Sequence, residues 1–302
     1  MVKMSEKYGR KAVPYGFLAP FYLFFIGMFI IPVIYAVVQA LYARRTNSLG
    51  FGISHTVFVG LSNFQSVITS GTFWSGVGRV VLFGIVQIPV MMTIAVALAL
   101  VLDTQLVRLR RLFRFAMFLP YAVPGVVAAI LWSFLYVPNL SPIVPLLQHI
   151  PGLVHLNLVG SRTVLWSIAN IVTWEWTGYD MLIVIASLQS ISPELYEAAR
   201  VEGATEWQIA WRIKIPLLAP ALGMSGLFSI IGSLQLFNEP TVLRAITPNV
   251  TSSYTPNMYA YAAAFSSNNY HTAAAIAVVL AVITFFFSFL LLTTLSRREV
   301  LQ

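Results

Sequence analysis

The sequence predicts an all-α fold, a polytopic membrane helix bundle with six transmembrane helices. Of its 302 residues, 58% are hydrophobic and 9% are charged. An average soluble domain has about 25% charged residues, so this chain could not cover a soluble surface. The net charge of +8 comes from small basic clusters between long apolar segments. That distribution is typical of membrane topology, so we expect a lipid bilayer and no nucleic acid as the chain's surroundings.

Six segments are long and apolar enough to span a bilayer, for which roughly 20 residues are needed. The first follows Lys3, Lys7, Arg10 and Lys11. It exceeds the apolar region of a signal peptide, about 7–15 residues, and is read as an uncleaved span. We treat residues 1–302 as a single transmembrane domain. The spans, with soft boundaries, are about 15–42, 74–102, 112–137, 163–189, 215–237 and 272–295.

The basic residues set the expected orientation. With the N-terminus inside, most lysines and arginines fall in inner segments, as cytoplasmic loops require. Both termini are therefore expected in the cytoplasm of a multi-pass plasma-membrane protein. The outer loops, about 43–73, 138–162 and 238–271, are rich in Gly, Pro, Ser, Asn and Thr, and we expect loops with short interfacial helices there. The fourth span is the least regular because it contains Glu175 and Asp180.

Residues 190–214, here called the inner loop, read as two short helices joined at Gly203. Ser192 is a good N-cap and Pro193 suits the first helical position. Gly203 can take the left-handed conformation that ends the first helix. Thr205 and Gln208 have the spacing of a capping box for the second. Helical spacing puts small and apolar side chains on one face of each helix. Such faces suit either another protein or the membrane headgroups, and geometry alone leaves both open.

The inner loop resembles a known motif. Glu197-Ala198-Ala199, three residues, Gly203, nine residues, Ile213, one residue, then Ile215-Pro216 resembles the EAA motif of binding-protein-dependent ABC importer permeases, in which Leu usually precedes the proline. The resemblance covers nearly the whole chain and is closest to the carbohydrate (maltose/oligosaccharide-type) permeases. Three stretches carry it further: Phe118–Pro124 with Trp132, Leu188–Tyr196, and Tyr259–Phe265 with Ala273–Ala275. The Gly-Gly-Pro usual after span five is absent.

This resemblance implies a type I ABC importer permease that translocates a sugar, a disaccharide or oligosaccharide. It implies three partners: a second homologous permease subunit, an ATP-binding-cassette ATPase dimer that uses ATP and Mg²⁺, and an extracytoplasmic solute-binding protein. It implies a bacterial inner membrane and alternating access. The inner loop would couple the permease to the ATPase through Glu197, Ala198, Ala199, Gly203, Ile213 and Pro216.

The chain itself is not expected to be an enzyme or to hold a cofactor or metal. None of its lysines, Lys3, Lys7, Lys11 and Lys214, follows a glycine, so the phosphate-binding P-loop is missing. The four histidines lie in or beside outer loops without the spacing of metal ligands. ATP hydrolysis is therefore assigned to a separate polypeptide.

Polar groups at membrane depth are costly, and they mark candidate positions on a substrate pathway. Sugars are bound by amides, carboxylates and flat aromatic faces. Such residues can also simply tie helices together, which is the interpretation we favour for Gln87. The alternative function is a secondary transporter or channel that uses intramembrane acids, but the sequence lacks the two related halves typical of one. The pathway candidates are Tyr121, Asn170, Trp174, Gln235, Phe237, Asn238 and Glu239.

Overall fold

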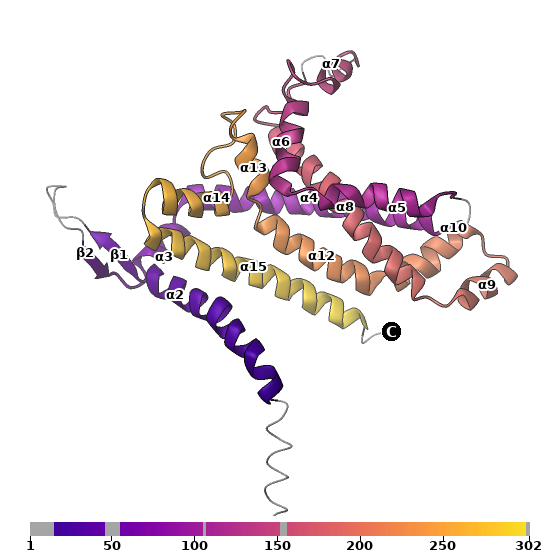
Figure 1. Ribbon diagram of the computed structural model, residues 1–302, viewed down its shortest axis with the longest axis horizontal. Coiled ribbons are helices and arrows are strands. Elements are labelled where there is room, and N and C mark those ends of the chain that lie inside the picture. The colour runs from indigo at the N-terminus through magenta and orange to yellow at the C-terminus, as the bar shows by residue number, and fades with distance from the viewer. Residues whose placement is uncertain (1–14, 46–54, 105–106, 152–155, 300–302) are drawn as a thin grey trace, which may run out of the picture. The chain divides into compact units, whose positions relative to one another are not determined.

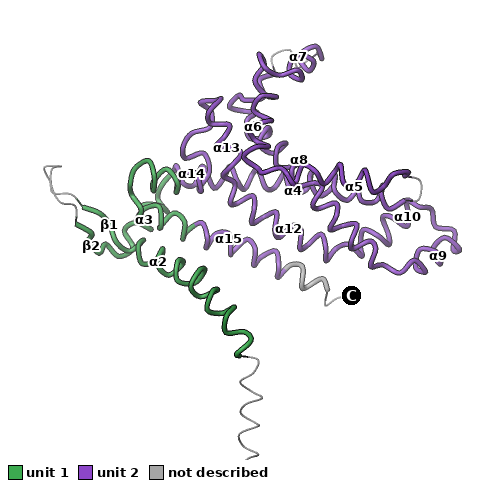
Figure 2. The backbone as a smooth tube through the Cα atoms, in the orientation of Figure 1, with its two compact units in different colours: residues 1–70, 260–279 green, residues 71–259, 280–302 purple. Residues whose placement is uncertain are grey.

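The computed structural model describes residues 15–45, 55–104, 107–151 and 156–299, and it is mostly helical (Figure 1). The basic residues Lys3, Lys7, Arg10 and Lys11, on which the predicted orientation partly depends, lie outside the described residues. The chain divides into two compact units (Figure 2). Unit 1 comprises Met1–Ser70 and Ala260–Val279, and unit 2 comprises Gly71–Tyr259 and Leu280–Gln302.

Unit 1 contains the first membrane span, the helix Tyr15–Ala40, which includes η1 (Ile26–Ile30) and α2 (Ile31–Ala40). It also contains α3 (Ser62–Ile68), η4 (Ala262–Ser266) and the start of α15 (Tyr270–Glu299). The end of the span is fixed by side-chain hydrogen bonds to its carbonyl groups. The Asn63 amide donates to the carbonyls of Ala40 and Tyr42 at 2.8 and 2.7 Å, and the His271 ring nitrogen lies 2.9 Å from the Gln39 carbonyl.

The first outer loop differs from the prediction because it contains a β-hairpin. Strands β1 (Tyr42–Arg45) and β2 (His55–Phe58) pair antiparallel, with Tyr42 opposite Phe58 and Arg45 opposite His55. The rings of Tyr42 and Phe58 meet edge to face, with centroids 5.5 Å apart. Aromatic cross-strand pairs of this kind stabilise a hairpin, and they depend on a register that a search for helical spans does not detect.

Unit 2 is built on the long helix α4 (Gly71–Asp103), which packs along α8 (Val164–Gln189) and α12 (Ala219–Leu234). Buried apolar side chains form one cluster around Phe83, Ile168 and Leu243, and a second around Ala95, Met181 and Leu218. Small residues allow the close approach. A methyl group added to Gly178 of α8 would collide with the Met117 carbonyl. The remaining helices of unit 2 before α15 are α5 (Arg110–Phe118), η2 (Leu119–Ala122), α6 (Gly125–Tyr136), α7 (Ile143–Gln148), α9 (Pro193–Val201), α10 (Glu206–Ile209), η3 (Ala210–Lys214), α11 (Ile215–Leu217), α13 (Asn238–Leu243) and α14 (Pro256–Tyr261).

The predicted third span, 112–137, is a broken helix. The segment Arg110–Ala122 and helix α6 meet at 96°. Pro124 explains the break, since proline disfavours helical conformation in the residue before it. Val123, which precedes Pro124, is indeed extended, with φ −80° and ψ 129°.

Among the described residues, four helices are long and apolar enough to cross a membrane, or five if the bent pair counts as one span. Helix α8 is not among them, although it has 26 residues, because its polar side chains lower its hydropathy. The prediction of six spans is compatible with this result if α8 is the sixth. The predicted span 215–237 corresponds to α11, α12 and an irregular end at Gln235–Phe237.

The inner loop folds as the sequence predicts. Helix α9 ends at Gly203, whose φ of +87° is left-handed, and α10 follows. At the start of α10, the Thr205 hydroxyl accepts a hydrogen bond from the Gln208 amide, and the Gln208 side chain accepts one from the Thr205 amide at 2.8 Å. Ser192 does occupy the N-cap position of α9, but its side chain makes no capping hydrogen bond. Local capping thus determines the shape of this loop.

Candidate functional site

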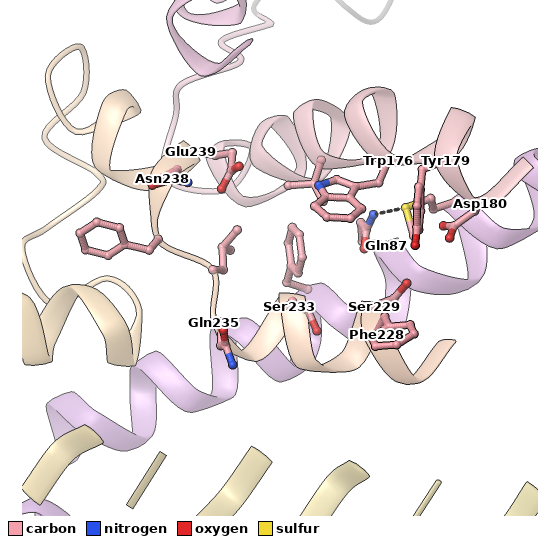
Figure 3. Close-up of a pocket in the computed structure, with 16 residues that line it drawn as sticks. Gln87, Trp176, Tyr179, Asp180, Phe228, Ser229, Ser233, Gln235, Asn238 and Glu239 are labelled. Atoms are coloured by element: carbon pink, nitrogen blue, oxygen red, sulfur yellow. Dashed lines mark hydrogen bonds between the residues drawn. The ribbon is translucent and has the colours of Figure 1, made fainter. Parts of the chain in front are cut away.

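A cavity of about 250 Å³ lies between α4, α8, α12 and the start of α13 (Figure 3). Most of its wall is apolar, but each of the four elements also contributes polar side chains, which carry amide, hydroxyl or carboxylate groups. Aromatic rings stand beside these polar groups. The polar and aromatic lining residues are Phe83, Gln87, Trp176, Tyr179, Asp180, Phe228, Ser229, Ser233, Gln235, Phe237, Asn238 and Glu239.

Three aromatic residues form a platform on one side of this cavity. The ring of Tyr121 stacks on that of Tyr179, with centroids 4.7 Å apart and planes inclined by 22°. Trp176 meets Tyr121 edge to face at 5.2 Å and Tyr179 at 5.9 Å. Mutual packing holds the rings in fixed orientations. Flat, rigid apolar faces of this kind suit the ring faces of a sugar.

Asp180 brings a carboxylate to the buried end of the cavity, where it is only 3% exposed. One of its oxygens accepts a hydrogen bond from the Ser225 hydroxyl of α12, and the other has no partner among the described residues. Nearby, the Gln87 amide donates to the Met91 sulfur at 3.2 Å and to the Thr173 hydroxyl at 3.3 Å. A buried oxygen without a partner is costly, so Asp180 retains capacity for a ligand hydroxyl.

Two further carboxylates meet at the broken third span. A methyl group added to Gly125 would lie 3.2 Å from a Glu175 oxygen and 3.4 Å from a Glu239 oxygen. Both acids are buried. Gly125 begins α6, so its amide end, which carries partial positive charge, faces the two acids. The break at Pro124 therefore places the start of α6 beside both acids.

The pathway candidates from the sequence fall into two places. Gln235, Phe237, Asn238 and Glu239 all line the cavity, and Tyr121 stacks on two of its lining residues. Asn170 and Trp174 do not lie there.

Asn170 lies in a separate cavity with Tyr136, and its amide donates to the Tyr136 hydroxyl at 2.9 Å. Trp174 packs edge to face on Trp132, at 5.8 Å. These contacts tie α8 to α6. Which of the candidates contact substrate remains a prediction.

Sequence reasoning missed two lining residues of α8, Trp176 and Tyr179, and noted Asp180 as a polar group at membrane depth without choosing it for the pathway. Their spacing of i, i+3 and i+4 puts them on one helix face, and that was the available signal. It was overlooked because Asn170 and Trp174, four residues apart, share another face of the helix. Gln87, interpreted from the sequence as structural, both lines the cavity and bonds to neighbouring helices.

The inner loop differs from the cavity, where polar groups are buried. Here large apolar side chains are exposed. Val201 is 90% exposed and Trp207 is 71% exposed, while Glu197 and Ala198 of the motif are also exposed. Trp207 and Trp211 pack on each other, with ring centroids 5.5 Å apart. Ile213 is half-buried and Pro216 is exposed. Glu197, Val201 and Trp207 thus form an exposed apolar and acidic surface on α9 and α10.

One exposed ion pair connects the two helices of the inner loop. The Arg200 guanidinium lies 2.7 Å from a Glu206 oxygen. This hydrogen bond holds the pKa of Glu206 below its ordinary value and raises the pKa of Arg200. Because both side chains are at least half exposed to solvent, the pair adds little stability.

Apolar helices, a broken span beside buried acids and an internal cavity that carries polar groups on a mostly apolar wall define a membrane transport protein. Residues 94–302 match the family of binding-protein-dependent transport system inner membrane components. The chain belongs to this family and is a permease, a multi-pass inner-membrane subunit and not an enzyme.

Named relatives and solved structures agree with this assignment. The chain is 30% identical over 253 residues to the lactose transport system permease protein LacF of Rhizobium radiobacter, covering 82% of each chain. It is 31% identical over 216 residues to the sn-glycerol-3-phosphate transport system permease protein UgpA of Agrobacterium fabrum, covering 72% of this chain and 71% of the relative. A bacterial ABC transporter for import of the acidic polysaccharide alginate has the same fold, with a TM-score of 0.80, 19% identity and coverage of 98% and 99%.

Proposed function

We propose that this permease is one of two homologous membrane subunits of an ATP-driven importer for neutral disaccharides or oligosaccharides. The observation that carries the proposal is the inner loop, whose two short helices expose Val201, Trp207 and the motif residue Glu197 to the surroundings. Large exposed apolar patches mark sites of protein association. An ATPase subunit is the partner that the family's transport cycle requires.

In this proposal both termini and the inner loop lie in the cytoplasm, and an extracytoplasmic binding protein delivers the sugar. An ATPase dimer with bound ATP and Mg²⁺ holds the exposed faces of α9 and α10. Glu197, Ala198, Ala199 and Gly203 form the contact, Glu197 by charge-assisted hydrogen bonds and the alanines by allowing close approach. ATP-driven closure displaces the inner loop and reorients the bundle, which provides alternating access.

The charge of the cavity favours a neutral sugar. Asp180 and Glu239 line it, and among the lining residues that the structure describes there is no Lys, Arg or His. An anionic sugar would meet carboxylates without a compensating cation in a largely apolar wall, which is unfavourable. The named relatives span both classes, lactose and glycerol phosphate. We therefore propose neutral substrates because of the residues that line this cavity, and not because of sequence similarity to these relatives.

The direct test is uptake by the complete complex, reconstituted in vesicles with its binding protein and ATP. We expect ATP-dependent accumulation of neutral disaccharides or short oligosaccharides, and no accumulation of uronate oligosaccharides or sugar phosphates. A complex without ATP serves as the control. Uptake driven by a proton gradient without ATP would support the secondary-transporter alternative, and preferential uptake of anionic sugars would refute the neutral assignment.

A further inference from the structure

The inner end of α4 is tied to the inner loop by a buried ion pair. Asp103 is the last residue of α4, and Lys214 is the last residue of η3, 111 residues later. The Lys214 ammonium lies 2.6 Å from an Asp103 oxygen, and the two side chains are 10% and 25% exposed. Lys214 is one residue from α11, which continues into α12. One contact thus joins the start of the fifth span to the end of the second.

Tyr196 attaches α9 to the same ammonium group. Its ring centroid lies 4.9 Å from the Lys214 nitrogen, within the range of a cation–π interaction. Its hydroxyl is buried and has no hydrogen-bond partner among the described residues. Burial raises the pKa of Tyr196, and the Asp103 carboxylate adds to this effect, so the phenol stays neutral. Tyr196 directly precedes Glu197 of the motif. We call Asp103, Tyr196 and Lys214 the inner joint.

Charge, more than packing, holds the inner joint together. Asp103 sits at the C-terminus of α4, where the helix dipole already places partial negative charge. The positive charge of Lys214 compensates both the negative charge of the carboxylate and the partial negative charge of the helix end. Because the pair is largely removed from water, losing one partner would leave the other uncompensated. The pair Arg200–Glu206 of the same loop is well exposed and lacks this property.

The inner joint connects the inner loop to the candidate cavity. Helix α4 contributes Gln87 and Met91 to the cavity wall, and α12 contributes Phe228 and Ser229. Both helices meet at the joint, α4 through its last residue and α12 through the adjoining η3 and α11. A displacement of α9 that is held at Tyr196 and Lys214 would therefore move both walls together. Without the ion pair, the inner loop could tilt while the walls stayed in place.

We propose that Lys214 is a positioning residue that locks the inner loop to the inner end of α4, so that movement of α9 reaches the cavity. This inference rests on the proposed function, because it concerns how ATPase closure is transmitted. Lys214 contacts neither substrate nor nucleotide in this scheme. Its role is to keep α9, α4 and the start of α12 at fixed angles through its ammonium charge.

The test exploits the absence of cysteine from the chain. In the complete reconstituted complex, Lys214→Cys introduces this permease's only thiol. A groove of about 640 Å³ lined by Lys214, Trp207 and Trp211 gives reagents access. Aminoethyl methanethiosulfonate restores an ammonium on a side chain of similar length, and methyl methanethiosulfonate adds a neutral group. The measured quantity is sugar transported per ATP hydrolysed, with wild-type complex exposed to the same reagents to account for thiols on other subunits.

We expect Lys214→Cys complexes to hydrolyse ATP but to transport about tenfold less sugar per ATP, a typical size for lost coupling. Aminoethylation should restore most of the ratio, and methylthiolation should not. A wild-type ratio in unmodified Lys214→Cys, or equal recovery with both reagents, would overturn the inference.

If Lys214→Cys complexes do not assemble, the double variant Asp103→Lys with Lys214→Asp, which exchanges the two charges, tests the inference instead. If this double variant transports more sugar per ATP than Asp103→Lys alone, the role of the inner joint is supported. If it transports no more, the inference is overturned. The wild-type complex separates this inference from the proposed function. Wild-type complexes that fail to couple ATP hydrolysis to uptake refute the function, whereas coupled wild type with equally coupled variants refutes only the role of Lys214.

Discussion

The candidate cavity and the inner loop deviate from their surroundings in opposite ways. In the cavity, carboxylates are buried within apolar helices, Asp180 at 3% and Glu239 at 8% exposure. In the inner loop, Val201 and Trp207 are large apolar side chains turned outward. Burying a charge and exposing an apolar patch are both unfavourable unless a partner compensates. The difference indicates two kinds of partner, a hydroxyl-rich ligand inside and a protein surface outside.

Two glycines show how differently the two regions are built. Gly178 of α8 is required by packing, since an added methyl group would collide with the Met117 carbonyl and lie 2.9 Å from the Cα of Phe118. Gly203 of the inner loop is required by backbone conformation, since its φ is +87° while open space surrounds it. The first glycine makes the bundle possible and the second sets a bend on its surface. Substituting each should therefore fail in a different way.

The largest effect is expected at Gly178. Gly178→Val would force α8 away from Met117 and Phe118, displacing Trp176, Tyr179 and Asp180 with it. Overpacking without room to relax belongs to the mechanisms that cost more than about 4 kcal/mol. We expect almost no monodisperse protein after detergent extraction. Gly226→Ala in α12, where an added methyl group meets nothing within 4 Å, should purify normally. Recovery of Gly178→Val with an unchanged Tm would contradict the packing role.

A more selective loss is expected at Gly203. A β-branched residue in the left-handed conformation costs about 1–2 kcal/mol, so Gly203→Val should reorient α9 against α10 without unfolding the bundle. We expect normal insertion and Tm, with substrate-stimulated ATP hydrolysis abolished. Gly203→Asn should be milder, because asparagine tolerates this conformation. Glu197→Ala should resemble Gly203→Val by removing the charged contact. Normal stimulation in both Gly203→Val and Glu197→Ala would remove the inner loop from the coupling scheme.

The inner loop could be predicted from sequence because its determinants are local. The capping box joins residues three positions apart, Thr205 and Gln208, and the bend at Gly203 follows from the properties of one residue. The inner joint has no such local determinant. Lys214 pairs with Asp103, which lies 111 residues away in the sequence. The pairing depends on where α4 ends relative to η3. Only packing of the spans brings these charges together.

The cavity was only partly predictable for a similar reason. The run from Gln235 to Glu239 combines amide, aromatic and carboxylate groups within five residues, and all five line the cavity. For α8, Asn170 and Trp174 are four residues apart, as are Trp176 and Asp180, so helical spacing offered two candidate faces. Nothing local distinguishes the face with Asn170, which bonds to Tyr136 of α6, from the face with Asp180. That choice is made by tertiary packing.

The smallest loss of function is expected from substitutions inside the cavity, where several side chains contribute to ligand binding. Hydrogen bonds contribute about 1 kcal/mol each, and those to charged groups about 1.5–3 kcal/mol, so Asn238→Ala should weaken uptake about fivefold and Glu239→Gln about tenfold. Neither residue lies in the inner loop, so ATPase assembly and basal hydrolysis should stay normal. Asn170→Ala, in the separate cavity with Tyr136, is the matched control and should retain most uptake. If Asn238→Ala and Glu239→Gln both transport at the wild-type rate, these residues serve the packing of α13 against α6, and the contrast between the two regions reduces to the inner loop alone.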